Sequence, residues 1–234
     1  MAKLYYPAER MYNNRVKGVC RMDLKEKALY VCDALEKEYP LAECTLIYEE
    51  AWQLMISVRL AAQCTDARVD IVTAELFKKY PSPKAVAEAN YEDLLALIRP
   101  CGLGATKTRD VQASMRKLVD EYDSIVPDDL DTLLTFPGVG RKSANLIVGD
   151  IYGKPAIVCD THCIRISNLL GLTGSKNPEK VERDLRAIVP PERGNDLCHR
   201  FVLHGRACCV ARRPDCERCC LKEVCNHYSE TCVQ

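Results

Sequence analysis

The chain has 234 residues, 47% of them hydrophobic, and its 33 basic side chains balance 33 acidic ones, as in a globular protein with one large core or two smaller ones. No apolar run reaches the ~18 residues of a membrane span and the first residues lack a signal-peptide core, so we expect no membrane partner. Fifteen cysteines, an odd number at irregular spacing, fit a reducing compartment better than a disulfide scaffold, which predicts a soluble intracellular protein.

Apolar residues recur at helical spacing along nearly the whole chain. One helix start is marked by Ser82 as N-cap and Pro83 at the first helical position. The one β-like run, 156–159, is too isolated to form a sheet. The sequence therefore predicts an all-α protein with two lobes. The expected helices are 23–38, 52–62, 66–79, 83–88, 91–98, 107–122, 128–135, 141–152, 161–170, 178–188 and 196–208.

Four cysteines near the C-terminus, Cys209, Cys216, Cys219 and Cys225, have the spacing C-x6-C-x2-C-x5-C. Four thiolates in so short a stretch can converge on one metal centre, and they suit zinc or an iron–sulfur cluster. The polar, Pro-containing segment 210–215 should loop outside the metal. Ordinary buried cysteines would not predict such tight clustering. The spacing alone leaves the choice of metal open.

The segment 133–145 (LLTFPGVGRKSAN) predicts two helices joined by a tight turn. Gly138 and Gly140 permit positive φ and the close approach of another backbone. A helix that starts at about Gly140 exposes its first N–H groups, which suits a phosphate. Lys142 lies in that first turn, where the positive potential favours a neutral, nucleophilic amine. The alternative is a hairpin used only for packing, with Lys142 a solvated surface residue.

Asp160 ends the short apolar run and precedes the next predicted helix. Either Asp160 or Thr161 is suited to be the N-cap of that helix. A cap residue at a cleft can also act as a general base, so a purely structural role and a catalytic role both remain open. We interpret His162 as a structural histidine.

The net charge of zero argues neither for nor against a nucleic-acid partner, but basic residues gather in three places. One is the N-terminal extension 1–22, and the second contains Arg99, Lys107 and Arg109. The third surrounds the four cysteines and contains Arg206, Arg212, Arg213, Arg218 and Lys222. Each patch alone is typical of solvated surface, so they matter only if the fold places them on one face.

From about residue 30 to 227 the chain resembles the endonuclease III family, the helix–hairpin–helix DNA glycosylases of base excision repair. The resemblance lies in six ordered motifs: 62–66 (AQCTD), Gly102-Leu103 followed by Lys107, 136–142 (FPGVGRK), 158–162 (VCDTH), 203–206 (LHGR) and the four cysteines ending at Cys225. Phe136 and the small residues 104–106 depart from the family pattern. The resemblance implies a [4Fe–4S] cluster on the four cysteines, Lys142 as the lyase nucleophile and Asp160 as the catalytic carboxylate.

The resemblance also implies an architecture and a set of DNA contacts. Residues 44–155 would form a central lobe with the hairpin, and 23–43 would pack with 156–234 in a cluster lobe. The implied DNA-contacting residues are Gln63, Leu103, Gly138, Gly140, Arg141, Arg212 and Arg213. Gln63 and Leu103 correspond to the family's strand-invading residues. The implied partner is double-stranded DNA with a damaged base or an abasic site, bound by a monomer.

Two rival functions remain at this point. A mismatch-type adenine glycosylase shares the hairpin and the cluster but lacks the hairpin lysine. A non-catalytic iron–sulfur DNA-binding protein would need neither Lys142 nor Asp160. The presence of both residues favours a bifunctional glycosylase and abasic-site lyase that acts on oxidised or ring-saturated pyrimidines.

Overall fold

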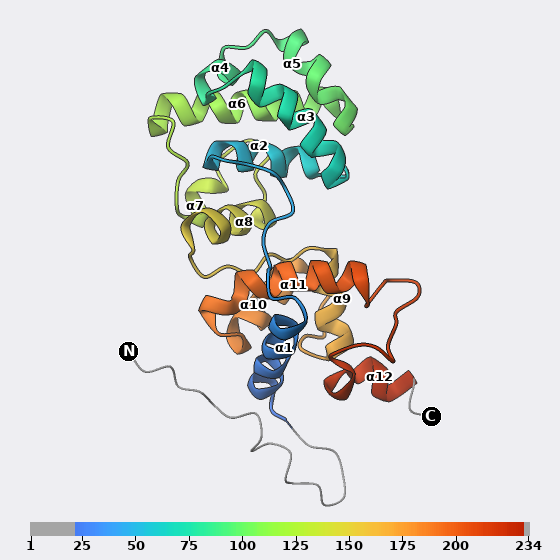
Figure 1. The fold of residues 1–234 in the computed structure, drawn as a ribbon. Helices are drawn as coiled ribbons and strands as arrows, with labels where there is room; N and C mark the ends of the chain where they lie inside the picture. The colour runs from blue at the N-terminus through green and yellow to red at the C-terminus, as the bar shows by residue number, and fades with distance from the viewer. Residues whose placement is uncertain (1–21, 232–234) are drawn as a thin grey trace, which may run out of the picture.

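The computed structural model describes residues 22–231, and every regular element in that range is helical (Figure 1). Two groups of helices are stacked along the long axis of the molecule, an upper lobe and a lower lobe in Figure 1. The upper lobe contains α2 (Ala51–Ala61), α3 (Asp66–Lys79), α4 (Pro83–Ala87), α5 (Tyr91–Ile98), α6 (Gly104–Tyr122), α7 (Leu130–Leu133) and α8 (Arg141–Tyr152). The lower lobe contains α1 (Leu24–Glu38), α9 (Thr161–Leu170), α10 (Pro178–Ile188), α11 (Gly194–Ala207) and α12 (Asn226–Thr231). The predicted all-α, two-lobed fold is confirmed.

Helix α2 forms the centre of the upper lobe. Eight of its eleven residues are buried, so it is apolar on nearly every side, as expected of a helix surrounded by others. Helices α3, α6 and α8 pack around it. Trp52 and Phe77 meet edge to face with ring centroids 5.2 Å apart, which fixes α2 against α3. Helix α2 is therefore held on several sides within the upper lobe.

Helix α1 belongs to the lower lobe, although the whole upper lobe separates it in sequence from its partners. Its buried face of Ala28, Val31, Cys32 and Leu35 packs against α10 and α11. Arg193 reinforces this packing with ion pairs of 2.6 Å to both Asp33 and Glu36. Helix α9 packs between α11 and α12. Along the chain, α1 belongs to the lower lobe, α2 to α8 form the upper lobe, and α9 to α12 complete the lower lobe.

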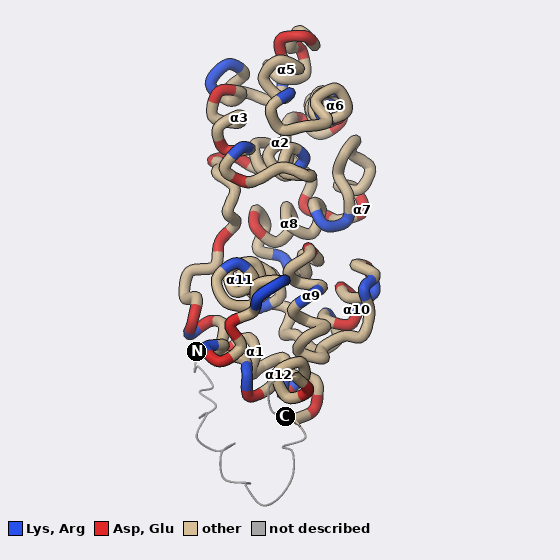
Figure 2. Tube along the Cα trace, turned by 90° about the vertical axis from the view of Figure 1, so that its right-hand side faces the viewer, with Lys and Arg blue, Asp and Glu red and all other residues tan. Residues whose placement is uncertain are grey.

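Polar pairs join the two lobes along helix α8. The carboxylate of Asp150 accepts a hydrogen bond of 2.6 Å from the amide of Asn195 and lies 2.8 Å from a ring nitrogen of His199 on α11. Gly149 lies so close to Asn195 that a Cβ atom would clash there. Acidic and basic positions are spread over both lobes (Figure 2). Within residues 22–231, Lys and Arg positions are thus interspersed with Asp and Glu positions in this view.

Most predicted helices match the observed ones, but three elements differ. Helix α6 begins at Gly104, not at residue 107. Gly104 packs closely on Arg99 and Leu95, where a Cβ atom would lie only 3.1–3.2 Å from them, so the missing side chain lets the helix start there. Helix α7 is one short turn, and α12 was not predicted. The run 156–159 is extended and buried but pairs with no strand within residues 22–231.

Two further expectations concern the chain as a whole. Within the described residues, no helix has both the length and the apolar character needed to cross a bilayer. The predicted N-terminal extension 1–22 falls, except for its last residue, outside the described part of the chain.

Candidate active site and cysteine cradle

The turn between α7 and α8 is built from a buried aromatic and two glycines with different roles. Phe136, which departs from the family pattern, is buried with its ring against that of Tyr122 and beneath the amine of Lys117. Gly138 adopts the positive φ that a glycine permits, with φ of 76°. A Cβ atom at this position would lie only 2.6 Å from the side chain of Arg59. Gly140, which would also permit a positive φ, has φ of −97°.

Gly140 is the N-cap of α8 and provides no side-chain cap, so the N–H groups of the first turn face outward. A Cβ added at Gly140 would meet nothing within 4 Å. The space over the helix end is therefore open, as the binding of a phosphate there would need.

Lys142 is the second residue of α8, and its side chain is exposed. Its positive charge reaches two groups that come from other elements, the carboxyl of Asp66 and the ring of His162. Burial lowers the pKa of His162, the charge of Asp160 opposes this shift, and Arg165, Arg206 and Lys142 add to it. Lys142 and Asp160, 18 positions apart in sequence, thus lie close enough to act on the same histidine.

Asp160 is the N-cap of α9, and its Oδ1 accepts a hydrogen bond of 2.7 Å from the N–H of Cys163. The side chain is half-buried, which leaves Oδ2 available for another contact. His162 packs directly on Gly205, where a Cβ would collide with its ring, and its Nδ1 lies 3.2 Å from Arg165. These contacts agree with the structural role predicted for His162. The charges of Asp160 and Lys142 also act on its ring.

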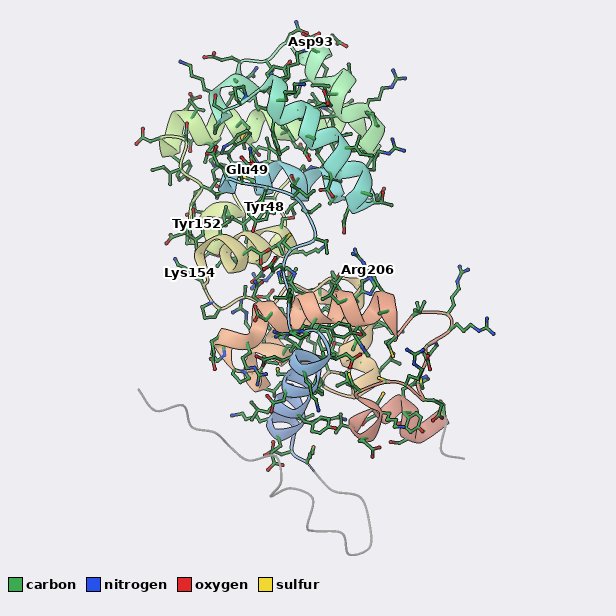
Figure 3. All side chains as sticks on the ribbon, viewed as in Figure 1. Tyr48, Glu49, Asp93, Tyr152, Lys154 and Arg206 are labelled. Carbon is green, nitrogen blue, oxygen red and sulfur yellow. The ribbon has the colours of Figure 1, made fainter. Side chains whose placement is uncertain are left out.

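An ion pair between the lobes adjoins these residues and was not predicted. Arg206 at the end of α11 reaches the gap between the lobes in Figure 3 and donates a hydrogen bond of 2.8 Å to Asp66 at the start of α3. Thr45 donates a second bond of 2.7 Å to the same oxygen. Burial raises the pKa of Asp66, but these bonds and the charges of Arg206 and Lys142 lower it overall. The opposite charges of the motifs 62–66 and 203–206 were the only sequence signal for this pair.

Arg141, predicted to contact DNA, forms an ion pair within the protein, although its side chain is 43% exposed. Its Nε and Nη2 bind the two carboxylate oxygens of the buried Glu182 on α10 at 2.6 Å and 3.0 Å. Arg186 binds the same carboxylate at 3.0 Å. Burial raises the pKa of Glu182, but the bonds from both arginines outweigh burial and lower it. Arg141 therefore ties the hairpin to the lower lobe, while its Nη1 and the second N–H of Nη2 make no bond to Glu182.

Gln63 and Leu103, the predicted strand-invading residues, lie on loops at the surface of the upper lobe. Both are exposed, Leu103 to 57%, and both have positive φ, of 56° and 50°. Lys107, predicted to belong to a basic surface patch with Arg99 and Arg109, is instead fully buried. That prediction is wrong because the amine of Lys107 is satisfied by backbone carbonyls inside the lobe. Arg99 and Arg109 are exposed, as expected.

The four predicted metal-ligating cysteines converge on one hollow in the lower lobe. All of them, together with Cys208, line a space of about 320 Å³ that is partly open to solvent, whereas Cys220 does not line it. Burial raises the pKa of Cys209, and raises that of Cys219 to about 12. Buried thiolates are costly without a cation, so this sulfur-lined hollow suits a metal centre that supplies the compensating charge.

Two side chains outside the cysteine motif contact the segment that lines this hollow, which we call the cysteine cradle. Arg165 on α9 donates a hydrogen bond of 2.6 Å to the carbonyl of Cys209. His204 is buried between Cys219, 3.4 Å from its Nε2, and the hydroxyl of Tyr39, 3.2 Å from its Nδ1. Cys208 lies within 4.8 Å of this histidine and of Cys219, which makes it a competing ligand candidate. Arg212 and Arg213 are exposed on the loop between the first two cysteines.

Comparison with known proteins gives consistent matches. Residues 56–191 match the family model described as HhH-GPD superfamily base excision DNA repair protein. The chain is 39% identical to endonuclease III of Synechocystis sp. over 86% of this chain and 92% of that protein. It is 34% identical to endonuclease III of Escherichia coli over 87% and 96% of the two chains. A trapped endonuclease III–DNA covalent intermediate superposes with a TM-score of 0.84 at 38% identity, covering 89% of this chain and 99% of that one.

Proposed function

The chain belongs to the HhH-GPD superfamily and is a bifunctional DNA glycosylase and abasic-site lyase of the endonuclease III type, and from this premise we propose which of its residues perform each step. The observation that carries the assignment is the exposed amine of Lys142 at the start of α8, within electrostatic reach of the same histidine as Asp160. Borohydride reduction during the reaction tests it, because reduction fixes a Schiff base covalently on the attacking lysine.

Lys142 is the proposed nucleophile. Its unprotonated amine attacks C1′ of the deoxyribose, the bond from C1′ to the base breaks, and the base leaves with a proton. The sugar ring opens to a Schiff base on Nζ. Loss of a proton from C2′ then expels the 3′ phosphate by β-elimination and nicks the strand. An exposed lysine suits this sequence because the amine must reach a sugar outside the protein core.

Asp160 is the proposed acid–base partner of Lys142. Its Oδ1 is held by the N–H of Cys163, which fixes the carboxylate at the start of α9. The other oxygen can take a proton from the lysine and stabilise positive charge on the sugar. Cap and catalyst are thus compatible roles of one side chain. The proposed substrates are oxidised or ring-saturated pyrimidines in duplex DNA.

DNA binding is assigned to two kinds of contact. The open backbone over Gly140, just after the Gly138 turn, binds phosphate at the start of α8, and Arg141 can add the N–H groups that do not bind Glu182. Gln63 and Leu103 enter the base stack, because a base inside a duplex must be flipped out before Lys142 can reach its sugar. An exposed leucine has no packing role within the protein, which supports the assignment for Leu103.

Arg212 and Arg213 are proposed to clamp phosphates, which leads to a binding prediction. Replacing both with alanine is expected to weaken binding to damaged and undamaged duplex alike. The slope of log K against log salt should flatten by about 1.8, since each lost phosphate contact removes ~0.9. Titration by fluorescence anisotropy at several salt concentrations measures both effects.

The matched control replaces Lys180 and Arg183, two exposed cations on α10, with alanine. This control removes the same net charge from the lower lobe without touching the loop 210–215. It should change the salt slope much less. A change in lesion preference alone, with no change in salt slope, would contradict the phosphate-clamp role of Arg212 and Arg213.

The cysteine cradle is proposed to hold a [4Fe–4S] cluster on Cys209, Cys216, Cys219 and Cys225. The all-sulfur donor set and the shared hollow fit such a cluster, and they also explain why half-buried thiols gather there. When bound, the cluster would fix the loop 210–215 and so the two arginines on it. Zinc is the alternative that the donor set alone leaves open.

The remaining proposals concern context. The protein acts on double-stranded DNA as a monomer, inside the cell and in association with DNA. Its lobes have their boundaries near residues 44 and 156, and the hairpin belongs to the upper lobe. Neither rival function is favoured by any contact in the described residues.

A further inference from the structure

We infer that Lys107 is a positioning residue that sets the spacing and orientation of the two loops carrying Gln63 and Leu103. This inference rests on the proposed base-flipping role of those two residues. It concerns a side chain that touches neither DNA nor the reacting atoms.

The contacts of Lys107 join the two loops directly. Its Nζ donates one hydrogen bond of 2.8 Å to the carbonyl of Leu60, three residues before Gln63. A second bond of 2.8 Å goes to the carbonyl of Cys101, two residues before Leu103. The backbone N–H of Lys107 also donates to the carbonyl of Leu103 at 3.0 Å. One residue thus holds the Leu103 loop at two points and the end of α2 at a third.

The thiols of the same two loops are also in contact. Burial and the neighbouring thiol of Cys64, which follows Gln63, raise the pKa of Cys101 to about 11, and both sulfurs lie near the amine of Lys107. The two loops therefore meet at one buried point beneath the surface that carries Gln63 and Leu103.

The backbone of both loops needs such support. Gln63 and Leu103 have positive φ without being glycines, a conformation that persists only where the surroundings impose it. Both side chains are exposed, so their own packing cannot impose it. The two bonds from the buried amine of Lys107, to the carbonyls of Leu60 and Cys101, supply a restraint that reaches both loops.

Burial of a lysine is also costly in itself. Lys107 is 0% exposed, and burial lowers its pKa, with the charge of Arg59 acting in the same direction. Among the described residues, the bonds of its amine go to backbone carbonyls and not to a carboxylate. A buried charge of this kind gives weak stabilisation, whereas it can fix geometry by forming several directed bonds at once.

The test separates flipping from chemistry in the holoprotein. Lys107→Met and Leu103→Ala are each assayed under single turnover on a duplex with thymine glycol and on a duplex with an abasic site. The abasic sugar has no paired base to extrude, so its cleavage depends less on the loops. Lys107→Met is expected to slow base release at least about tenfold while abasic-site cleavage changes by less than about twofold. Borohydride trapping of abasic DNA counts the active molecules in each preparation.

Epistasis distinguishes positioning from general stability. In the background Gln63→Ala/Leu103→Ala, adding Lys107→Met should cause no further loss of base release, because there is nothing left to position. The control Lys154→Met removes another lysine that donates to a backbone carbonyl, that of Asp128 at 2.8 Å, and should leave both activities unchanged. Additive losses in the combined variant would overturn the inference.

Further outcomes of these assays also bear on the positioning role of Lys107. Equal losses on both substrates, tracking the active fraction, would make Lys107 a merely structural residue. If Leu103→Ala has no effect on base release, the proposed flipping role fails first, and this is distinguishable from a failure of Lys107 alone. Should Lys107→Met not fold, Lys107→Gln keeps a donor for one carbonyl. Its amide exchange should then accelerate in 61–64 and 101–104 only; acceleration throughout the upper lobe would overturn the inference.

Discussion

Replacing Lys142 with glutamine is expected to abolish the borohydride-trapped DNA adduct and the β-elimination nick while duplex binding persists. Glutamine keeps a polar side chain of similar length but has no nucleophilic amine. The side chain is exposed, so no core contact is lost and the fold should be unchanged. Removal of a covalent nucleophile should lower the rate by at least about 10³-fold, measured by gel under single turnover.

The matched control is Lys154→Gln, which changes an exposed lysine just beyond the other end of α8. It should trap and nick at the wild-type rate. A Lys142→Gln protein that still formed the adduct and nicked at the wild-type rate would remove the central assignment.

Asp160→Asn separates the two roles of this residue. An asparagine oxygen can still accept the bond from the N–H of Cys163, and asparagine is as good an N-cap as aspartate, so stability should change little. The lost charge should slow base release by about 10²–10⁴-fold. Single-turnover assays and thermal melts measure the two effects separately. Normal base release combined with a lowered melting temperature would reduce Asp160 to a cap.

The second large effect concerns the cysteine cradle. Purified protein is expected to be brown and to contain about four iron atoms per chain, measured by absorbance and metal analysis. Cys216→Ser should lose the cluster and most of the soluble yield, because one of four sulfur ligands is removed. Cys220→Ser should keep both, since Cys220 does not line the hollow.

Cys208→Ser tests the competing ligand set. Cys208 lines the hollow and lies near Cys219 and His204, but it falls outside the C-x6-C-x2-C-x5-C pattern. Full iron content in this variant supports the four assigned ligands, and its loss would reassign one of them. Stoichiometric zinc without iron in protein prepared anaerobically would sink the cluster assignment.

Local signals explain the elements that the sequence predicted well. The bounds of α3, α5, α8 and α9 agree with expectation because caps and breaks, such as Asp160 at the start of α9, are properties of a few adjacent residues. The start of α6 was misplaced because Gly104 reads as a breaker, although its lack of a Cβ is what allows the helix to pack closely there. The two-lobed fold and the convergence of the cysteines were likewise predictable.

Long-range pairing explains what was missed. Lys107 reads as a surface cation because nothing nearby in sequence shows that the carbonyls of Leu60 and Cys101 surround its amine. Asp66 and Arg206 lie 140 positions apart, so their pairing follows from the fold and not from either motif. The roles of Lys142 and Asp160 stay predictions until the adduct is tested.

The return of the chain to its first helix has a consequence for synthesis. Helix α1 leaves the ribosome before the rest of its lobe, since Arg193, which pairs with Asp33, is made 160 residues later. At a synthesis rate of about 5–20 residues per second, the apolar face of α1 therefore stays without its partner helices for on the order of ten to thirty seconds. The upper lobe, α2 to α8, can fold during that interval. The lower lobe is completed only when the cysteine segment has emerged, so the proposed metal centre would be assembled after all residues of the upper lobe and its hairpin have been made.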